Sequence, residues 1–124
     1  MRTRLRVLIA DDHPGVVRAV SRLLAMNYDV VGSVADGSGL LEAAQRLQPD
    51  VIVLDMNLPD ADGLKACYQI TQEHPAMKVI VFTAMDEPDV RQRAFEVGAC
   101  AFVNKLSSVE TLLAAVKSVD DNRG

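Results

Sequence analysis

The sequence predicts an α/β domain in which a five-stranded parallel sheet is covered by helices on both faces, a doubly wound arrangement. Two observations lead to this prediction. Short apolar runs of strand length alternate with segments whose apolar residues recur at helical spacing. One of these runs, residues 51–54, is apolar without interruption, which is typical of a strand buried on both faces of a parallel sheet. Right-handed crossovers between parallel strands then limit the possible topologies.

Length and composition indicate one domain over residues 1–124, with the possible start of a linker at residues 119–124. The chain has 124 residues, of which 49% are hydrophobic, so it can bury a sizeable single core. Its formal net charge is −4. A surface that grips nucleic acid is basic, so we expect no nucleic acid to be bound by this chain itself.

The sequence shows no sign of a membrane or secreted protein. No apolar run approaches the ~20 residues that a membrane helix requires, and no signal-peptide pattern precedes the first strand. The two cysteines, Cys67 and Cys100, lack metal-ligand spacing and are expected to be reduced packing residues. We therefore expect a cytoplasmic, soluble domain.

The first half of the chain is predicted to hold three strands and two helices. Residues 5–10 form the first strand, and Pro14 suits the first turn of a helix over residues 14–26. Residues 29–34 form a weaker strand whose polar content suggests a sheet edge. A second helix opens at residues 36–39 and closes before Pro49. The third strand then ends in Asp55.

The second half alternates in the same way. Gly63 begins a helix whose inward stripe is expected to hold Leu64, Cys67, Tyr68 and Thr71. Residues 78–83 form the fourth strand, and residues 86–89 begin the fourth helix, which Gly98 stops. Residues 100–103 form a short fifth strand. Ser107 or Ser108 is expected to cap the fifth helix, with four residues facing inward: Val109, Leu112, Leu113 and Val116. The polar tail, residues 120–124, is expected to fray.

Polar residues collect where these strands end. All strands of a parallel sheet point the same way, so the residues after strands one, three, four and five should meet at one edge, where ligands of open α/β sheets bind. These residues are Asp11 and Asp12, Asp55, Thr83, and Lys105.

This group of residue types suits a metal ion and a phosphoryl group. Neighbouring carboxylates raise each other's pKa unless a cation joins them, and oxygen ligands suit Mg²⁺. A lysine and a hydroxyl beside the metal can hold phosphoryl oxygens, and an aspartate can attack phosphorus. Each residue alone has a simpler explanation: Asp55 can open a turn, the acidic pair can cap a helix, Thr83 can make a local hydrogen bond and Lys105 can be solvated. Because four separate strand ends supply complementary groups, we favour a site for a metal ion and a phosphoryl group over these simpler explanations.

From Arg4 to Val119 the chain resembles the receiver domains of bacterial response regulators. The resemblance is carried by Val7–Pro14 with its acidic pair, by Val53–Gly63 around Asp55, by Phe82-Thr83-Ala84, and by Lys105. It implies a flavodoxin-like strand order, 2-1-3-4-5. The Asp-Asp-His-Pro start and the lack of proline after Lys105 are similar to the subfamily that carries a helix-turn-helix DNA-binding domain.

The resemblance implies a role for each matched residue. Asp55 would accept phosphate from a sensor histidine kinase or a small acyl phosphate. Mg²⁺, for which Mn²⁺ could substitute, would bind to Asp12, Asp55 and the main-chain carbonyl of Asn57, with Asp11 acting through water. Phosphoryl oxygens would contact Lys105, Thr83 and the Ala84 main-chain N–H. Thr83 and Phe102 would form the switch, although phenylalanine lacks the hydroxyl of the tyrosine that the family often has.

The implied function is that of a phosphorylation-controlled switch. Such a switch is not an enzyme in the ordinary sense, but it assists its own phosphorylation and dephosphorylation. Its output would be transcription regulation through a DNA-binding domain absent from this chain, with homodimerisation on phosphorylation as a possibility. The alternatives are a stand-alone receiver that regulates a protein partner, a degenerate receiver that only binds proteins, and a metal-dependent aspartyl-phosphate hydrolase. Hydrolases of the haloacid-dehalogenase group place a second aspartate two residues after the nucleophile, where this chain has Asn57.

Three smaller expectations concern loops. His13 is expected to be a loop residue without a metal role, and Asp60 and Asp62 to serve the turn before the third helix. The Lys105–Leu106 peptide bond is expected to be trans, because a cis bond before a residue other than proline costs about 2.5–4 kcal/mol. We expect the resulting loop to hold Lys105 less firmly.

Overall fold

A computed structural model of the protein describes residues 3–85 and 87–123. The elements alternate along the chain in this order: β1 (Arg6–Ala10), α1 (Pro14–Ala25), β2 (Asp29–Val34), α2 (Gly37–Leu47), β3 (Val51–Leu54), α3 (Gly63–Glu73), β4 (Lys78–Thr83), α4 (Pro88–Glu96), β5 (Ala101–Asn104) and α5 (Val109–Asn122). Every strand pairing is parallel, and the strand order is 2-1-3-4-5. The predicted fold class, strand order and edge position of β2 are confirmed.

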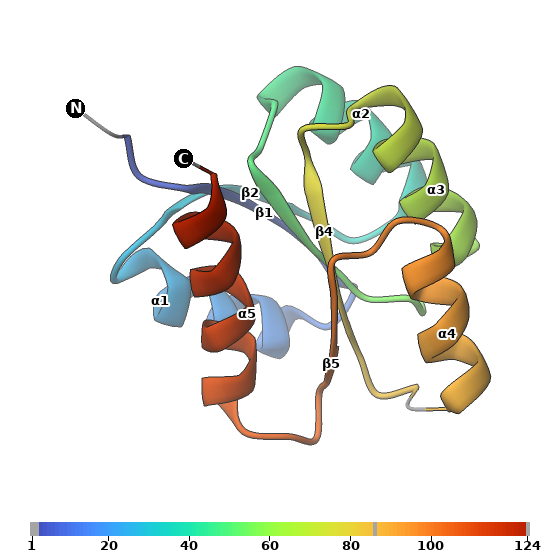
Figure 1. The fold of residues 1–124 in the computed structure, drawn as a ribbon. Coiled ribbons are helices and arrows are strands. Elements are labelled where there is room, and N and C mark those ends of the chain that lie inside the picture. The colour runs from blue at the N-terminus through green and yellow to red at the C-terminus, as the bar shows by residue number, and fades with distance from the viewer. Residues whose placement is uncertain (1–2, 86, 124) are drawn as a thin grey trace.

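The sheet lies between two layers of helices, with α1 and α5 on one face and α2, α3 and α4 on the other (Figure 1). Alternate residues of β3 enter different cores because side chains alternate across a strand. Ile52 and Leu54 pack with residues of α2, α3 and α4. Val51 and Val53 pack with residues of α1 and α5. All four are at most 1% exposed, which explains why this run contains no polar residue.

The structure corrects the predicted inward-facing residues of two helices, α3 and α5. Tyr68 is exposed, and the buried residues of α3 are Gly63, Ala66, Cys67 and Ile70. Val109 is also exposed, at the first position of α5, while Leu112 and Val116 are buried. In α5 the rest of the predicted stripe is confirmed, since Leu113 also packs against the core.

The cysteines and the helix starts also differ in part from expectation. Cys67 is buried, but Cys100 is exposed, so only one of them is a packing residue. Ser108 occupies the N-cap position of α5 without a side-chain cap hydrogen bond, and the Ser107 hydroxyl donates to the Asn104 carbonyl. Asp86, expected in the first turn of the fourth helix, lies outside the described residues.

The expected fraying of the tail is wrong for residues 120–122, which belong to α5. Local and tertiary contacts explain the longer helix. Lys117 pairs with Asp121 at 3.0 Å, one turn along the helix. Arg123, just beyond the helix, pairs with Asp120 at 2.9 Å and lies 3.5 Å from the Asp50 carboxylate of the sheet layer. Gly124 lies outside the described residues.

Candidate functional site

The carboxyl ends of β1 and β3 bring two aspartates together. Asp11 follows β1 and Asp55 follows β3, and both side chains are buried, with 4% and 3% exposed. The Asp55 main-chain N–H donates to the Ala10 carbonyl (2.8 Å), so the ladder between the two strands continues up to Asp55. The two carboxylates are therefore fixed by the sheet and not by a flexible loop.

Lys105 supplies the cation that makes this burial tolerable. Its Nζ lies 2.6 Å from Asp11 Oδ2 and 2.9 Å from Asp55 Oδ2. Burial lowers the Lys105 pKa, but hydrogen bonds to the two carboxylates and their charges raise it, and the net effect is an increase. Lys105 therefore remains charged at neutral pH and joins the two aspartates into one hydrogen-bonded unit.

The loop that carries Lys105 has the expected trans peptide bond before Leu106. The expectation that Lys105 would be held less firmly is wrong for this structure, because the side chain is 12% exposed and lies in both ion pairs. The Lys105 main-chain N–H also donates to the Thr83 carbonyl at 2.9 Å, which ties the start of the loop to β4.

Asp12 lies beside this unit and has an unsatisfied oxygen. Within the described part of the chain, Oδ1 of Asp12 is buried and accepts no hydrogen bond. His13 Nδ1 lies 3.1 Å from it but also 3.0 Å from Asp11 Oδ1, and a single ring N–H can donate well to only one of them. A buried carboxylate oxygen without a partner is costly, and a cation would remove that cost.

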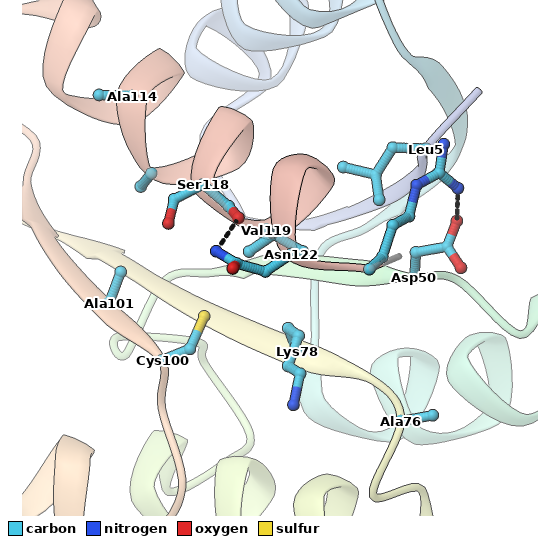
Figure 2. A pocket seen from close by; sticks show the side chains of 12 residues that line it. Leu5, Asp50, Ala76, Lys78, Cys100, Ala101, Ala114, Ser118, Val119 and Asn122 are labelled. Carbon is cyan, nitrogen blue, oxygen red and sulfur yellow. Dashed lines mark hydrogen bonds and ion pairs between the residues drawn. The ribbon is translucent and has the colours of Figure 1, made fainter. Parts of the chain in front are cut away.

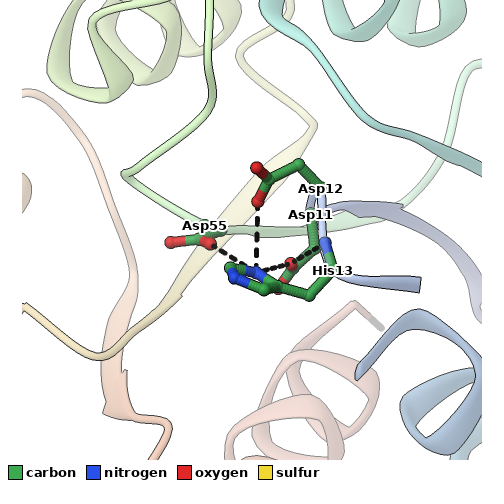
Figure 3. A group of neighbouring side chains, drawn as sticks. All are labelled: Asp11, Asp12, His13 and Asp55. Atoms are coloured by element: carbon green, nitrogen blue, oxygen red, sulfur yellow. Dashed lines mark hydrogen bonds and ion pairs between the residues drawn. The ribbon is translucent and has the colours of Figure 1, made fainter. Parts of the chain in front are cut away.

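Asp11, Asp12, His13 and Asp55 each offer a ligand atom, and these atoms all lie within 4.8 Å of one another (Figure 3). The carboxylate oxygens, including the unpartnered one of Asp12, fit a hard divalent cation such as Mg²⁺. His13 lies in the loop before α1, as expected, and its ring contacts the carboxylates of this group. The sequence shows that His13 directly follows the acidic pair, but not that its ring turns toward the carboxylates.

The other candidate residues lie around this group. The Asn57 main-chain N–H donates to Asp55 Oδ1 at 3.1 Å, so the Asp55 loop folds back on its own carboxylate. Thr83 ends β4 and is fully buried, and its hydroxyl accepts a hydrogen bond from the Met85 N–H at 3.2 Å. Ala84 lies in the bend between them. Thr83 is thus in the expected strand-end position, with its hydroxyl turned to its own loop.

Phe102 lies on β5 and is buried, with 8% exposed. The guanidinium carbon of Arg91, on α4, lies 5.0 Å from the centre of the Phe102 ring. This distance is within the range of a cation–π contact. The ring is already inside in this structure, so an inward movement on phosphorylation requires a starting conformation other than this one.

A family model for the response regulator receiver domain matches residues 7–117. The chain is a response regulator receiver domain. Its relatives are regulators of transcription and two-component signalling. The chain is 31% identical over 118 residues to the transcriptional regulatory protein DegU of Brevibacillus brevis, an alignment that covers 94% of this chain and 50% of the relative.

The response regulator GacA of Pseudomonas aeruginosa is 32% identical over 117 residues, covering 93% of this chain and 55% of GacA. A solved structure of the signal receiver domain of a response regulator named NarL, from Mycobacterium tuberculosis, has a TM-score of 0.90 at 31% identity. That match covers 98% of this chain and 100% of the other.

This receiver domain therefore belongs to a family of signalling switches and is not a typical enzyme. The match favours the receiver over the hydrolase alternative. Receiver domains bind Mg²⁺ through an acidic pocket, and the Asp11, Asp12 and Asp55 cluster is such a pocket. The chain spans about half the length of the curated relatives it matches. In the described residues, no helix is both long enough and apolar enough to cross a membrane.

Proposed function

We propose that Asp55 accepts a phosphoryl group from a sensor histidine kinase or a small acyl phosphate. The observation that carries this proposal is the Lys105 ammonium, which lies 2.9 Å from Asp55 Oδ2. An oxygen of the Asp55 carboxylate attacks phosphorus, the bond from phosphorus to the donor's leaving atom breaks, and the leaving group departs with that electron pair. The product is an aspartyl phosphate.

The surrounding residues serve this transfer by position and charge. Lys105, the Thr83 hydroxyl and the Ala84 main-chain N–H contact the phosphoryl oxygens and stabilise the charge spread over them. Asp12, Asp55 and the Asn57 carbonyl would hold Mg²⁺, with Asp11 contributing its negative charge nearby. When bound, Mg²⁺ neutralises charge on the carboxylates and on the phosphoryl oxygens. The same groups assist later hydrolysis of the aspartyl phosphate, so the domain contributes to both its phosphorylation and its dephosphorylation.

The consequence is a change of state at the surface formed by α4, β5 and α5. Thr83 turns from the Met85 N–H toward the phosphoryl group, and the phosphorylated state keeps the Phe102 ring inside behind it. A ligand shifts an equilibrium only toward the state in which it makes better contacts, and Thr83 gains such a contact. This surface then passes the signal to a DNA-binding output domain, as the transcriptional regulator DegU would suggest, or to a second copy of the chain.

The phosphoacceptor is tested by incubating the protein with acetyl phosphate and Mg²⁺ and mapping the base-labile adduct. The adduct should lie on Asp55 and be lost in Asp55→Asn. Asp29→Asn is a matched control, because Asp29 lies at the exposed start of β2. Labelling of Asp55→Asn, or a phosphoryl group on another residue of the wild-type chain, would contradict the assignment.

A further inference from the structure

A cavity of about 770 Å³ lies between α5 and the beginnings of β4 and β5 (Figure 2). Lys78 is the first residue of β4, and Cys100 directly precedes β5. The acidic site instead gathers residues that follow strands β1 and β3. The cavity shares no residue with that site and lies at the opposite end of the sheet.

The cavity exists because both layers carry small side chains at this end. Its wall includes Ala114, Ala115 and Ser118 of α5, with Cys100 and Ala101 from the sheet layer. On the same helix, Leu112 and Val116 are buried and fill the core. Protein interiors are close-packed, so a row of small residues between two fixed layers leaves space that an apolar group can occupy.

One cation at this wall is uncommitted. Lys78 is exposed, and its side-chain ammonium makes no hydrogen bond or ion pair with any other residue from 3–85 and 87–123. The other cation, Arg123, is engaged with Asp120 at 2.9 Å and with Asp50 at 3.5 Å. The Asp50 carboxylate in turn accepts the Arg6 main-chain N–H at 2.8 Å. Lys78 is therefore the cation of this wall that can pair with an anionic ligand.

The thiol of Cys100 does not neutralise Lys78. Burial raises the Cys100 pKa, and the charge of Lys78 acts in the opposite direction without cancelling the increase. Cys100 therefore remains a neutral thiol at neutral pH, while the Lys78 ammonium is close enough to act on it. Cys100 also lines the cavity, which makes it a natural reporter of occupancy.

We propose that this cavity binds a free monocarboxylate with an apolar body, of the medium-chain fatty acid type. The carboxylate pairs with the Lys78 ammonium, and the hydrocarbon lies along the apolar wall that Leu5, Ala101 and Val119 contribute. The volume is within the range of small-molecule sites, roughly 300–1,000 Å³. The proposal is independent of the phosphoacceptor assignment, since no residue is shared.

The binding test uses the whole chain and sodium decanoate below its micellar range. Isothermal titration should give saturable binding to one site. Modification of Cys100 by an aromatic disulfide reagent should slow at least about fivefold at saturation, because covering the sulfur blocks access. Cys67 has no exposed surface and does not compete for the reagent.

Two test variants, one control variant and one ligand control make the test specific. Lys78→Gln should weaken decanoate binding at least about tenfold, as expected for loss of a charge-assisted contact. Ala114→Leu should weaken it similarly by filling the cavity, and leucine is well tolerated in a helix. Lys117→Gln should bind as the wild type does, because Lys117 pairs with Asp121 outside the cavity. Decyltrimethylammonium should bind at least about tenfold more weakly than decanoate.

The proposal is overturned if the wild-type chain shows no saturable decanoate binding or if Cys100 is not protected. Equal affinity of Lys78→Gln and Lys117→Gln would also overturn it, as would stronger binding of the cationic amphiphile. Circular dichroism checks folding of each variant. If Ala114→Leu does not fold, the comparison of Lys78→Gln with Lys117→Gln decides the outcome.

Discussion

At the scale of single residues, Lys105 balances the charge of the acidic site. Its ammonium bridges Asp11 and Asp55 at 2.6 and 2.9 Å, and Asp12 adds a third carboxylate with an unpartnered oxygen. A divalent cation at the same carboxylates would meet repulsion from Lys105 and attraction from the three aspartates. The lysine therefore moderates the affinity of the site for metal while it stabilises the folded protein.

Replacing Lys105 with methionine should strengthen Mg²⁺ binding. Removal of a positive charge this close should raise the affinity on the order of tenfold at low ionic strength, and less at physiological salt. Isothermal titration with MgCl₂ measures the effect, and Lys117→Met on the exposed face of α5 is the control. An affinity that is unchanged or lower in Lys105→Met would show that Lys105 does not repel the ion.

The raised pKa of Lys105 predicts a loss of stability at high pH. Because the folded-state pKa lies above the ordinary value of 10.5, the stabilisation is complete below 10.5 and is lost as the pH rises through the folded-state value. Burial also raises the pKa of Tyr28 above 10.0, so Tyr28 likewise lowers the free energy of unfolding as the pH rises. The free energy of unfolding should therefore fall more steeply above about pH 10.5 in the wild type than in Lys105→Met, which keeps Tyr28. Parallel slopes for the two proteins would contradict the Lys105 contribution.

At the scale of elements, two neighbouring aspartates serve different helices. Asp62 caps α3, accepting from the Leu64 N–H at 3.0 Å, as expected for the turn before that helix. Asp60 instead accepts the Gly37 N–H at 2.5 Å, at the start of α2. Asp60 lies in the turn before α3, as expected, but its side chain ties that turn to the start of α2.

Asp60→Asn should lower the melting temperature at neutral pH. The hydrogen bond from Gly37 is the main reason why the Asp60 pKa is lowered from 3.8. Its stabilisation is therefore present above 3.8 and disappears as the pH falls through the lowered folded-state value. The difference between wild type and Asp60→Asn should shrink over that acidic range in thermal melts, with Asp29→Asn as the control. A difference that does not change with pH would count against this contact.

The connection between α4 and β5 depends on Gly98. Its φ is +110°, and a Cβ there would lie 2.7 Å from Thr71 Oγ1, which itself donates to the Val97 carbonyl at 2.9 Å. Gly98→Ala should lower the free energy of unfolding by about 1–3 kcal/mol. Gly15→Ala in α1, where a Cβ meets nothing within 4 Å, should be neutral or slightly stabilising. Denaturant unfolding of both variants measures this, and equal stabilities would refute the strain at Gly98.

At the scale of the whole molecule, the two ends of one sheet have different chemistry. The carboxyl ends of the strands hold a buried group of carboxylates around one lysine, and the opposite end holds an open cavity with an unpaired lysine. Both features depend on the same parallel sheet. Small single domains usually unfold in one cooperative step, so we expect a ligand at either end to stabilise the entire fold.

Mg²⁺ should raise the melting temperature through the acidic site. At ten times the dissociation constant, binding to the folded state contributes about 1.4 kcal/mol, which corresponds to a few degrees for a domain of this size. Asp12→Ala should abolish the shift, because it removes the oxygen that lacks a partner. Thermal denaturation with MgCl₂, and with NaCl at equal ionic strength, measures it. A shift of the same size in Asp12→Ala would mean that the ion binds elsewhere.

The sequence by itself determined the fold class, the order of the elements and the family. The reason is periodicity: short uninterrupted apolar runs such as Val51–Leu54, bounded by turn residues, are typical of strands covered on both faces, and polar residues at the strand ends must meet at one edge of a parallel sheet. The residues that form the acidic group could be named for the same reason, since Asp11, Asp55 and Lys105 each follow a strand.

Only the tertiary structure decided contacts between elements that are distant in the sequence. Asp60 reaches α2 across 23 residues, and Arg123 reaches Asp50 across 73. His13 joins the carboxylates because its ring turns toward them, which spacing does not specify. The cavity at α5 arises from small residues in two layers that no local pattern relates. Local propensity and periodicity fix which face a residue occupies, but the packing of whole layers decides which neighbour it meets there.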